Sequence, residues 1–394
     1  MLKKNNNGGL MSHRMKFLVV ATALSLSACS TLSSLNPFAE PDAKTAPAAL
    51  VDIKPSMALK TTWRYSLGSA GAYLFNPAIV GKQVYVASAN GEIAKLDAST
   101  GVQEWKVKAD MRLTAGVGAS ADLVVVAGEK GALLAYDAKG QLRWKVQAAT
   151  EVLATPVIAQ NMVIVQSIDN RISAYDTVTG ARKWMVERAL PVLTLRNVSG
   201  IAIADQMAIV ASPGGRLQAL SLINGAPRWE VMAAEPKGAT ELERLVDLSG
   251  TPVVMGSQVC AIAFQGKTAC FDLQTGANRW SKDVAGEVGL AADERYVFAS
   301  DTESSVFAFA IDGGMSAWKN EQLRNRKLST PTSFGRALVV GDSFGFLHFL
   351  SREDGSFLNR LSLDKGAIVA APLVYESNLI VQTQSGSIVA IATE

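Results

Sequence analysis

Short apolar segments separated by glycine-rich turns recur along the chain from about residue 60 onwards. In the first unit, residues 83–87 and 92–96 flank Asn90-Gly91. This predicts a β-hairpin with a two-residue type I′ turn, which needs positive φ at both central residues. Seven further hairpins follow the same scheme. Their turns are predicted at Lys130-Gly131, Asn170-Arg171, Gly214-Gly215, Gln265-Gly266, Ser304-Ser305, Phe344-Gly345 and Ser385-Gly386.

Each hairpin but the last is followed by a segment in which a glycine precedes a tryptophan by four residues, as in DASTGVQEW at residues 97–105. The seventh copy has Asn359 in place of the tryptophan, and Trp63 precedes the first hairpin. The other tryptophans are Trp105, Trp144, Trp184, Trp229, Trp280 and Trp318. Tryptophans that recur about every 40 residues indicate stacked supersecondary units.

Eight hairpins, but only seven complete units, leave the last unit without an outer strand. The Trp63 segment, residues 61–67, has no unit before it and can supply that strand. A closed ring also protects sheet edges that an open array would expose. We therefore predict an all-β fold, an eight-bladed β-propeller of four-stranded blades closed by the N-terminal strand. The alternative is a linear solenoid, which would need polar capping repeats.

The tryptophans are predicted to have a structural role. An indole at one equivalent position per blade can pack between neighbouring sheets and donate its N–H to a backbone carbonyl of the next unit. The glycine four residues earlier is expected to permit the turn between the third and fourth strands.

The N-terminal region divides into two parts. Residues 1–28 contain four basic and no acidic side chains, and the apolar run at 17–26 is too short to span a bilayer. We interpret residues 1–28 as a secretory signal, with Met11 or Met15 as alternative starts. Residues 29–60, rich in Ser, Pro, Ala and Thr, are expected to be a flexible tether before a propeller at 61–394.

Two sequence features resemble a known family. Ser27-Ala28-Cys29 resembles the lipobox of bacterial lipoproteins, although an ordinary export signal with an incidental cysteine is the alternative. The repeat Asp-x-x-Thr-Gly-x-x-x-Trp resembles that of pyrroloquinoline-quinone-dehydrogenase-like propellers, over about residues 60–394. Together they resemble the BamB family, lipoproteins of the β-barrel assembly machinery (Bam complex). The resemblance implies lipidation at Cys29 and an outer-membrane location facing the periplasm. By the same resemblance, Ser30 after the cysteine favours sorting to the outer membrane.

Two linkers are longer than the others. Trp105 to Val117 and Trp144 to Pro156 each span 12 residues, whereas Trp184 to Ile201 spans 17 and Trp229 to Pro252 spans 23. Linkers of the same kind emerge on one face of a propeller, so both excursions are expected side by side near the fourth blade. Loops on a rigid scaffold often carry binding function.

The family resemblance implies a binding partner for these two long linkers. Leu193-Thr194-Leu195-Arg196 matches a Leu-x-Leu-Arg motif with which BamB-like proteins contact the POTRA domains of BamA. Asp247 matches an Arg-Leu-x-Asp-x-Asp pattern, but Ser249 replaces its second aspartate, and Glu241 or Glu243 could compensate. Leu193, Leu195, Arg196 and Asp247 are thus the candidate partner-binding residues. Unfolded outer-membrane proteins are a further possible partner, with no specific residue behind them. An alternative is that the leucines fold back as a local cap.

Composition and motifs argue against other function classes. Beyond residue 28 the chain has 34 Lys and Arg against 35 Asp and Glu, which gives no case for nucleic-acid binding. His348 lies in an apolar strand and is predicted to be a strand side chain. Cys260 and Cys270 are not adjacent, unlike the cysteines of quinone-dependent dehydrogenases, and are expected as free thiols because Cys260 should face Phe271. We therefore predict a non-enzymatic scaffold without cofactor or metal. The alternative is a quinoprotein-like periplasmic dehydrogenase.

Overall fold

The computed structural model describes residue 1, residues 45–196 and residues 199–393. The chain separates into two units, Met1–Ala46 and Pro47–Glu394. The predicted signal segment and Cys29 lie outside the described residues. In the part that is described, no helix is long and apolar enough to cross a membrane. All that follows concerns the second unit.

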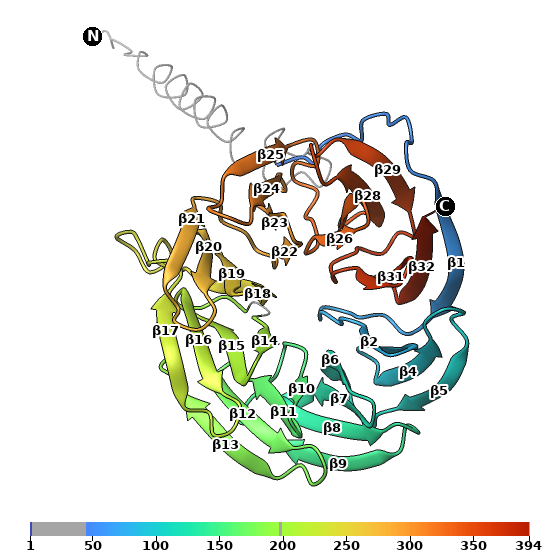
Figure 1. The fold of residues 1–394 in the computed structure, drawn as a ribbon, viewed down its shortest axis with the longest axis vertical. Coiled ribbons are helices and arrows are strands. Elements are labelled where there is room, and N and C mark those ends of the chain that lie inside the picture. Colours follow the sequence, from blue (N-terminus) through green and yellow to red (C-terminus); the bar gives the residue numbers. More distant parts are fainter. Residues whose placement is uncertain (2–44, 197–198, 394) are drawn as a thin grey trace. The chain divides into compact units, whose positions relative to one another are not determined.

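The second unit consists of eight four-stranded antiparallel sheets arranged in a ring, with the first strand of each sheet towards the centre (Figure 1). Blade 1 contains β2 (Ala78–Val80), β3 (Gln83–Ala87), β4 (Glu92–Asp97) and β5 (Gln103–Lys108); blade 2 contains β6 (Leu113–Ala119), β7 (Leu123–Gly128), β8 (Ala132–Asp137) and β9 (Leu142–Gln147); blade 3 contains β10 (Val157–Ala159), β11 (Met162–Gln166), β12 (Arg171–Asp176) and β13 (Arg182–Glu187); blade 4 contains β14 (Ile201–Ala204), β15 (Met207–Ser212), β16 (Arg216–Ser221) and β17 (Pro227–Met232). Blade 5 contains β18 (Leu248–Met255), β19 (Gln258–Ala263), β20 (Thr268–Asp272) and β21 (Asn278–Lys282); blade 6 contains β22 (Ala291–Ala292), β23 (Tyr296–Ser300), β24 (Val306–Ala310) and β25 (Ser316–Asn320); blade 7 contains β26 (Thr332–Phe334), β27 (Ala337–Gly341), β28 (Phe346–Ser351) and β29 (Phe357–Ser362); blade 8 contains β30 (Leu373–Tyr375), β31 (Asn378–Gln382), β32 (Ser387–Thr393) and β1 (Leu59–Ser66). A 3₁₀ turn at Glu129–Gly131 joins β7 and β8.

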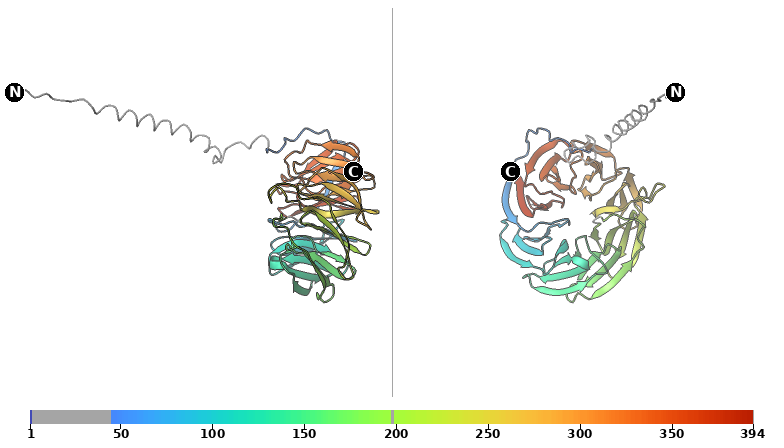
Figure 2. Two further views of the ribbon diagram at one scale, coloured as in Figure 1. Left: turned by 90° about the vertical axis from the view of Figure 1, so that its left-hand side faces the viewer. Right: turned by 180° about the vertical axis from the view of Figure 1, so that it is seen from behind.

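The ring is closed by its own first strand. β1 pairs antiparallel with β32, with Trp63 opposite Ala390. Trp63 and Ile388 of blade 8 share one apolar cluster with Val84 and Leu96 of blade 1, so side chains as well as backbone join the two ends. The predicted eight-bladed propeller and its N-terminal closure are both confirmed. Seen edge-on, the ring is a thick disc (Figure 2).

The tryptophans connect each blade to the next. Every indole Nε1 donates to a backbone carbonyl at the turn between the third and fourth strands of the following blade, at 2.8–3.0 Å. The acceptors for Trp63, Trp105, Trp144, Trp184, Trp229, Trp280 and Trp318 are Ala98, Ala138, Thr177, Leu222, Leu273, Ile311 and Arg352. Each of these indoles thus bonds its blade to the next one.

The repeated glycines lie beneath these indoles. Each has a φ between +67° and +80°, and a Cβ on it would come within 2.5–3.0 Å of the tryptophan of the preceding blade. The pairs are Gly101 with Trp63, Gly140 with Trp105, Gly180 with Trp144, Gly225 with Trp184, Gly276 with Trp229, Gly314 with Trp280 and Gly355 with Trp318. The glycine therefore permits the turn, as expected, and also makes room for the neighbouring indole.

The hairpin loops are one residue longer than predicted. Ser88 donates from its N–H to the carbonyl of Glu92, which leaves three loop residues, and only Gly91 of the Asn90-Gly91 pair has positive φ. This is the three-residue loop with a left-handed last residue rather than a type I′ turn. Equivalent left-handed third positions are Gly131, Asn170, Gly215, Ser304, Gly345 and Gly386.

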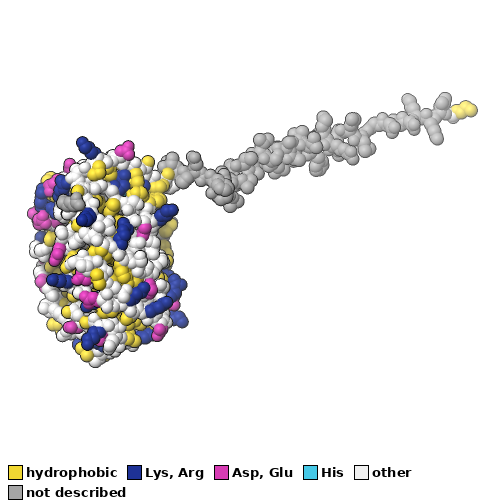
Figure 3. Space-filling view, turned by 90° about the vertical axis from the view of Figure 1, so that its right-hand side faces the viewer, with side chains coloured by type: hydrophobic (Ala, Val, Ile, Leu, Met, Phe, Trp, Pro, Cys, Tyr) yellow, Lys and Arg dark blue, Asp and Glu magenta, His cyan; other side chains and the backbone are white. Residues whose placement is uncertain are grey.

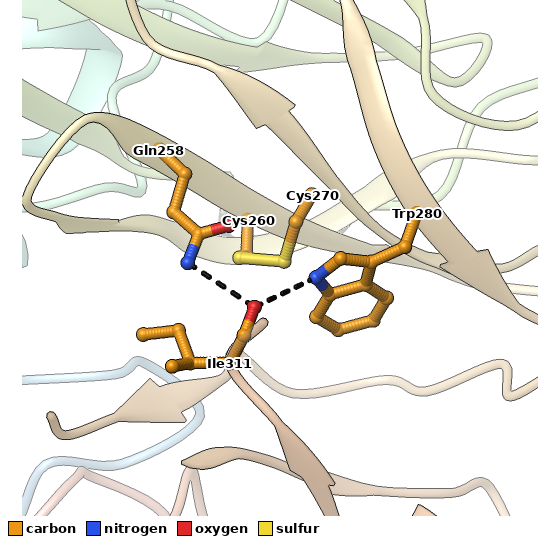
Figure 4. The surroundings of a disulfide bond; sticks show 5 residues. All are labelled: Gln258, Cys260, Cys270, Trp280 and Ile311. Carbon is orange, nitrogen blue, oxygen red and sulfur yellow. Dashed lines mark hydrogen bonds between the residues drawn. A yellow bond between two sulfur atoms is a disulfide. The ribbon is translucent and has the colours of Figure 1, made fainter. Parts of the chain in front are cut away.

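The same one-residue difference overturns the prediction of free thiols. The N–H of Ala263 donates to the carbonyl of Lys267, which leaves residues 264–266 as a three-residue loop, so Cys260 faces Cys270 and Val259 faces Phe271. A one-residue change of register moves a side chain to the other face of a sheet. The two buried cysteines form a disulfide beside Trp280 (Figure 4).

The propeller unit begins earlier than the sequence suggested. Its first residue is Pro47, and Ala48, Val51, Ser56 and Met57, all before the boundary expected at residue 60, are hydrogen-bonded to blade 7 and the linker before it. On the side of the ring that carries β1, basic, acidic and apolar side chains are interspersed (Figure 3). That part of the surface has no extended patch of one sign.

Candidate docking site

Two linkers near blade 4 build the candidate site. The first loop, residues 188–200, joins β13 to β14, and the second loop, residues 233–247, joins β17 to β18. In an antiparallel blade the second and fourth strands end on the same side, so these linkers share one face of the ring with the hairpin loops. We call this side the docking face.

The two loops lie side by side, as predicted. Ser199 forms a parallel bridge with Gly250, and its hydroxyl donates to the carbonyl of Leu248 at 2.8 Å. The N–H of Gly200 donates to the carbonyl of Gly250 at 2.9 Å. The C-terminal end of the first loop is therefore fixed on the start of blade 5.

Asp247 is buried, with 2% of its surface exposed, and it supports the first loop from beneath. Its Oδ2 accepts the N–H of Leu195 at 2.6 Å, and its Oδ1 accepts the N–H of Gly214 in the blade 4 hairpin at 2.8 Å. Hydrogen bonds to an ionised carboxylate are stronger than neutral ones. Asp247 thus holds Leu195 and its neighbours in one geometry, and it is not placed to touch a partner itself.

Arg196 extends outward from the segment that Asp247 supports. Its Nη2 donates to Oε2 of Glu151 at 2.6 Å, and the guanidinium remains largely exposed. An exposed ion pair of this kind contributes about 0–1 kcal/mol. It therefore orients the arginine, and breaking it to form a contact with a partner costs little free energy. Neither Glu151 nor Gly214 was predicted as part of the site: Glu151 lies in no motif, Gly214 was expected only as a hairpin-turn residue, and only the fold brings them here.

Exposed apolar side chains precede this arginine in the first loop. Val192 is 89% exposed and Leu193 40% exposed, and Leu190 is exposed as well, whereas Leu195 is half-buried. Leu190 and Leu193 therefore do not fold back as a cap. A cavity of about 280 Å³ lies beside Leu195 and Arg196, and its lining also includes Leu153, Gln166, Asn170 and Asp247.

The second loop supports the site, but Ser249 and Glu243 do not supply a carboxylate to it in place of the second aspartate of the family pattern. Leu245 and Val246 are buried, and Ser249, at the start of β18, donates its hydroxyl to the carbonyl of Gly286 at 2.9 Å. The carboxylate of Glu243 accepts the N–H groups of Thr240 and Ala239, and these bonds lower its pKa. Glu243 therefore caps its own turn.

The other chemistry-bearing candidates lie elsewhere. His348 is a buried side chain of β28, bound to Asp342 and Arg360, in agreement with the prediction of a strand side chain. No group of three or more His, Cys, Asp or Glu in the described ranges could hold a metal ion.

Fold and site together define an eight-bladed propeller of the quinoprotein type whose longest linkers form an exposed apolar and cationic surface. Residues 90–320 match the family described as outer membrane protein assembly factor BamB. The chain belongs to this family.

Relatives and solved structures agree with this assignment. The chain is 38% identical over 375 residues to outer membrane protein assembly factor BamB of Bordetella pertussis, covering 95% of this chain and 96% of the relative. Identity to the protein of that name from Burkholderia pseudomallei is 38% over 369 residues, covering 93% and 95%. BamB from Moraxella catarrhalis superposes with a TM-score of 0.79 at 26% identity, over 85% of this chain and 100% of that one.

The dehydrogenase alternative has only the fold in its favour. Quinohemoprotein alcohol dehydrogenase from Comamonas testosteroni superposes with a TM-score of 0.68 at 13% identity, over 85% of this chain and 76% of that one. A fold shared at this identity carries no activity with it.

Proposed function

We propose that this chain is a non-catalytic scaffold of outer-membrane protein assembly that docks through its first loop onto the POTRA domains of BamA within the Bam complex. The observation that carries the proposal is the bond from Leu195 to buried Asp247. It fixes a segment that presents Leu193 and Arg196 to solvent.

Energetics support this segment as an anchor. Arginine and large side chains dominate the binding energy of interfaces, and a loop that is already ordered loses less entropy on binding. Arg196 adds a cation beside the apolar surface of Leu190, Val192 and Leu193. The partner surface is therefore expected to combine an apolar patch with a carboxylate.

The test is binding of the full mature chain to purified POTRA domains. Leu195→Ala with Arg196→Ala is expected to weaken binding at least tenfold, or about 1.4 kcal/mol. Leu142→Ala with Arg143→Ala is the matched control, because it removes an exposed Leu-Arg pair from β9. Equal affinity of both double variants would remove the proposed site.

We also propose that the chain is anchored to the outer membrane, facing the periplasm, by acylation of Cys29. Two or three acyl chains are enough to hold a soluble domain on a bilayer. Mass spectrometry of the mature N-terminal peptide should show acylated Cys29, and Cys29→Ser should move the protein to the soluble fraction. An unmodified cysteine in the native protein would leave the ordinary export signal as the correct interpretation.

A further inference from the structure

The segment before β1 lies along the outer edge of blade 7. We call residues 48–57 the strap. The N–H of Ala48 donates to the carbonyl of Arg324 at 2.8 Å, and the N–H of Ser56 donates to the carbonyl of Leu358 in β29 at 2.9 Å. Met57 is buried in the apolar cluster shared by blades 7 and 8. In Figure 1 this blue segment passes outside β29 before it enters β1.

Side chains from blade 7 and the linker before it hold the carbonyl groups of the strap. Arg326 donates from Nη1 to Ala48 at 2.9 Å, and Arg360 donates from Nη1 to Val51 at 3.0 Å. Further along the strap, Arg336 donates to Ser56 and Asn359 donates to Met57. Backbone carbonyls in a segment without secondary structure thus receive charged donors at intervals along its length.

The two arginines nearest the start of the strap are held by a buried cluster. Oδ2 of Asp342 accepts Nε of Arg326 at 2.7 Å and Nε2 of His348 at 2.9 Å. Nε of Arg360 donates to Nδ1 of His348 at 3.2 Å. Asp342 and His348 are fully buried.

These contacts determine the state of the histidine. Because Nδ1 of His348 accepts from an arginine, the ring proton lies on Nε2 and points at Asp342. Burial lowers the pKa of His348, which also favours the neutral ring. Oδ1 of Asp342 accepts the N–H groups of Phe344 and Phe346, so the carboxylate cannot rotate without breaking the hairpin.

The cluster therefore connects the core of blade 7 to the strap. A buried ion is stabilised only if its remaining hydrogen-bonding groups find partners. The carbonyl of Ala48 supplies one such partner for buried Arg326, and the carbonyl of Val51 supplies one for half-buried Arg360. The strap is thus bonded to both arginines of the cluster.

The start of the strap lies on the docking face. Arg324 and Arg326 belong to the linker between β25 and β26, and the N–H of Asn325 donates to Glu303 in the blade 6 hairpin. Linkers and hairpin loops share that face, as argued above for the first and second loops. The chain therefore enters the propeller on the side that carries the candidate site.

We propose that Asp342 and His348 are positioning residues that pin the strap through Arg326 and Arg360, and so fix the entry of the N-terminal chain on the docking face. Release of the strap would add residues 48–57 to the chain that precedes the propeller. It would also uncover the outer edge of β29 for pairing with another strand. The inference does not depend on lipidation or on the POTRA contact.

The test is amide hydrogen exchange of the strap in the full mature chain. Arg360→Met removes the hydrogen bond to Val51 directly, whereas His348→Phe removes the two bonds that hold Arg360 and Asp342 in position; both keep an apolar side chain in place. Both are expected to raise exchange at residues 48–57 at least tenfold, with β28 protected as before. POTRA binding is expected to stay unchanged, which separates this proposal from the previous one.

Arg295→Met is the matched control, because Arg295 lies over Tyr296 at 5.0 Å much as Arg360 lies over Phe357 at 5.4 Å, but Arg295 is bonded to Glu353 and Tyr296 and not to the strap. If His348→Phe does not fold, Arg360→Met decides alone. Native-like strap exchange in Arg360→Met would overturn the proposal. So would equal acceleration in Arg295→Met.

Discussion

The side-chain amide of Asn359 donates a 2.7 Å hydrogen bond to the carbonyl of Met57, at the position where the other seven blades have a tryptophan. The exception follows from closure. Blade 8 takes β1 as its outer strand and has no turn between its third and fourth strands. An indole at 359 would therefore lack both the carbonyl and the glycine that every other tryptophan uses.

We predict that Asn359→Ala lowers the free energy of unfolding by about 1 kcal/mol, the usual net contribution of one hydrogen bond. Asn359→Trp should be no more stable than Asn359→Ala, because an indole at this position finds neither an acceptor carbonyl nor a glycine in blade 8. Asn278→Ala, at an exposed position on β21, should stay within about 0.5 kcal/mol of the native protein. Urea unfolding measures all three, and a more stable Asn359→Trp variant would contradict this explanation.

Two adjacent glycines separate backbone strain from packing. Gly313 and Gly314 have φ of +76° and +67°, but a Cβ at 313 meets nothing within 4 Å, whereas at 314 it lies 2.5 Å from Trp280. Gly313→Ala should therefore cost only the left-handed conformation, about 1–2 kcal/mol. Gly314→Ala should cost about 1–3 kcal/mol more, since the indole must move. Equal urea midpoints for the two variants would show that the Trp280 contact contributes little.

Asp247→Ala is expected to weaken POTRA binding at least tenfold although Asp247 is buried. The substitution leaves the N–H groups of Leu195 and Gly214 without their acceptor, so the first loop loses its fixed geometry. Asp293→Ala is the control, because Asp293 also accepts two backbone N–H groups but lies at a turn on the opposite face. Comparable binding by both variants, measured by calorimetry, would mean that Asp247 does not act on the site.

Removal of the disulfide should destabilise the protein without changing its function. For a sequence separation of 10 residues, chain entropy gives a stabilisation of about 2.5 kcal/mol. Cys260→Ala with Cys270→Ala should unfold at lower urea, and reductant should shift the native protein but not the variant. A native protein insensitive to reductant under unfolding conditions would argue against the bond.

Acid should weaken the turn that Asp272 organises. Its carboxylate accepts from Arg279 and from Thr275, and these bonds lower its pKa from 3.8 to about 2. Because the folded pKa is the lower one, the stabilisation is present above about pH 4 and is lost as the pH falls towards 2. The difference in urea midpoint between the native protein and Asp272→Asn should therefore shrink over that range. A constant difference would exclude this linkage.

The ring was predictable because its main contact is periodic. Each Gly–Trp pair joins consecutive blades, so a local spacing such as Gly101 to Trp105 reports the assembly of the whole fold. Closure was predictable from the count of hairpins and outer strands, because the last hairpin lacked an outer strand and the Trp63 strand had no hairpin before it.

The errors came from features that a local pattern does not determine. Asn90-Gly91 fits both a two-residue and a three-residue loop, and one residue decides whether Cys260 faces Phe271 or Cys270. Asp247 was found through a motif, but its burial beneath Leu195 depends on two linkers meeting in space. The strap has no period, and its partners Arg326 and Arg360 lie far away in sequence.

Closure of the whole ring depends on one strand pair, β1 with β32. β1 is synthesised first, but its backbone groups find their partners only once the seven residues of β32, near the other end of the chain, are present. A prematurely terminated chain that lacks β32 would expose two unpaired strand edges, which favour aggregation. A single missing strand thus leaves the ring open at both blades 8 and 1.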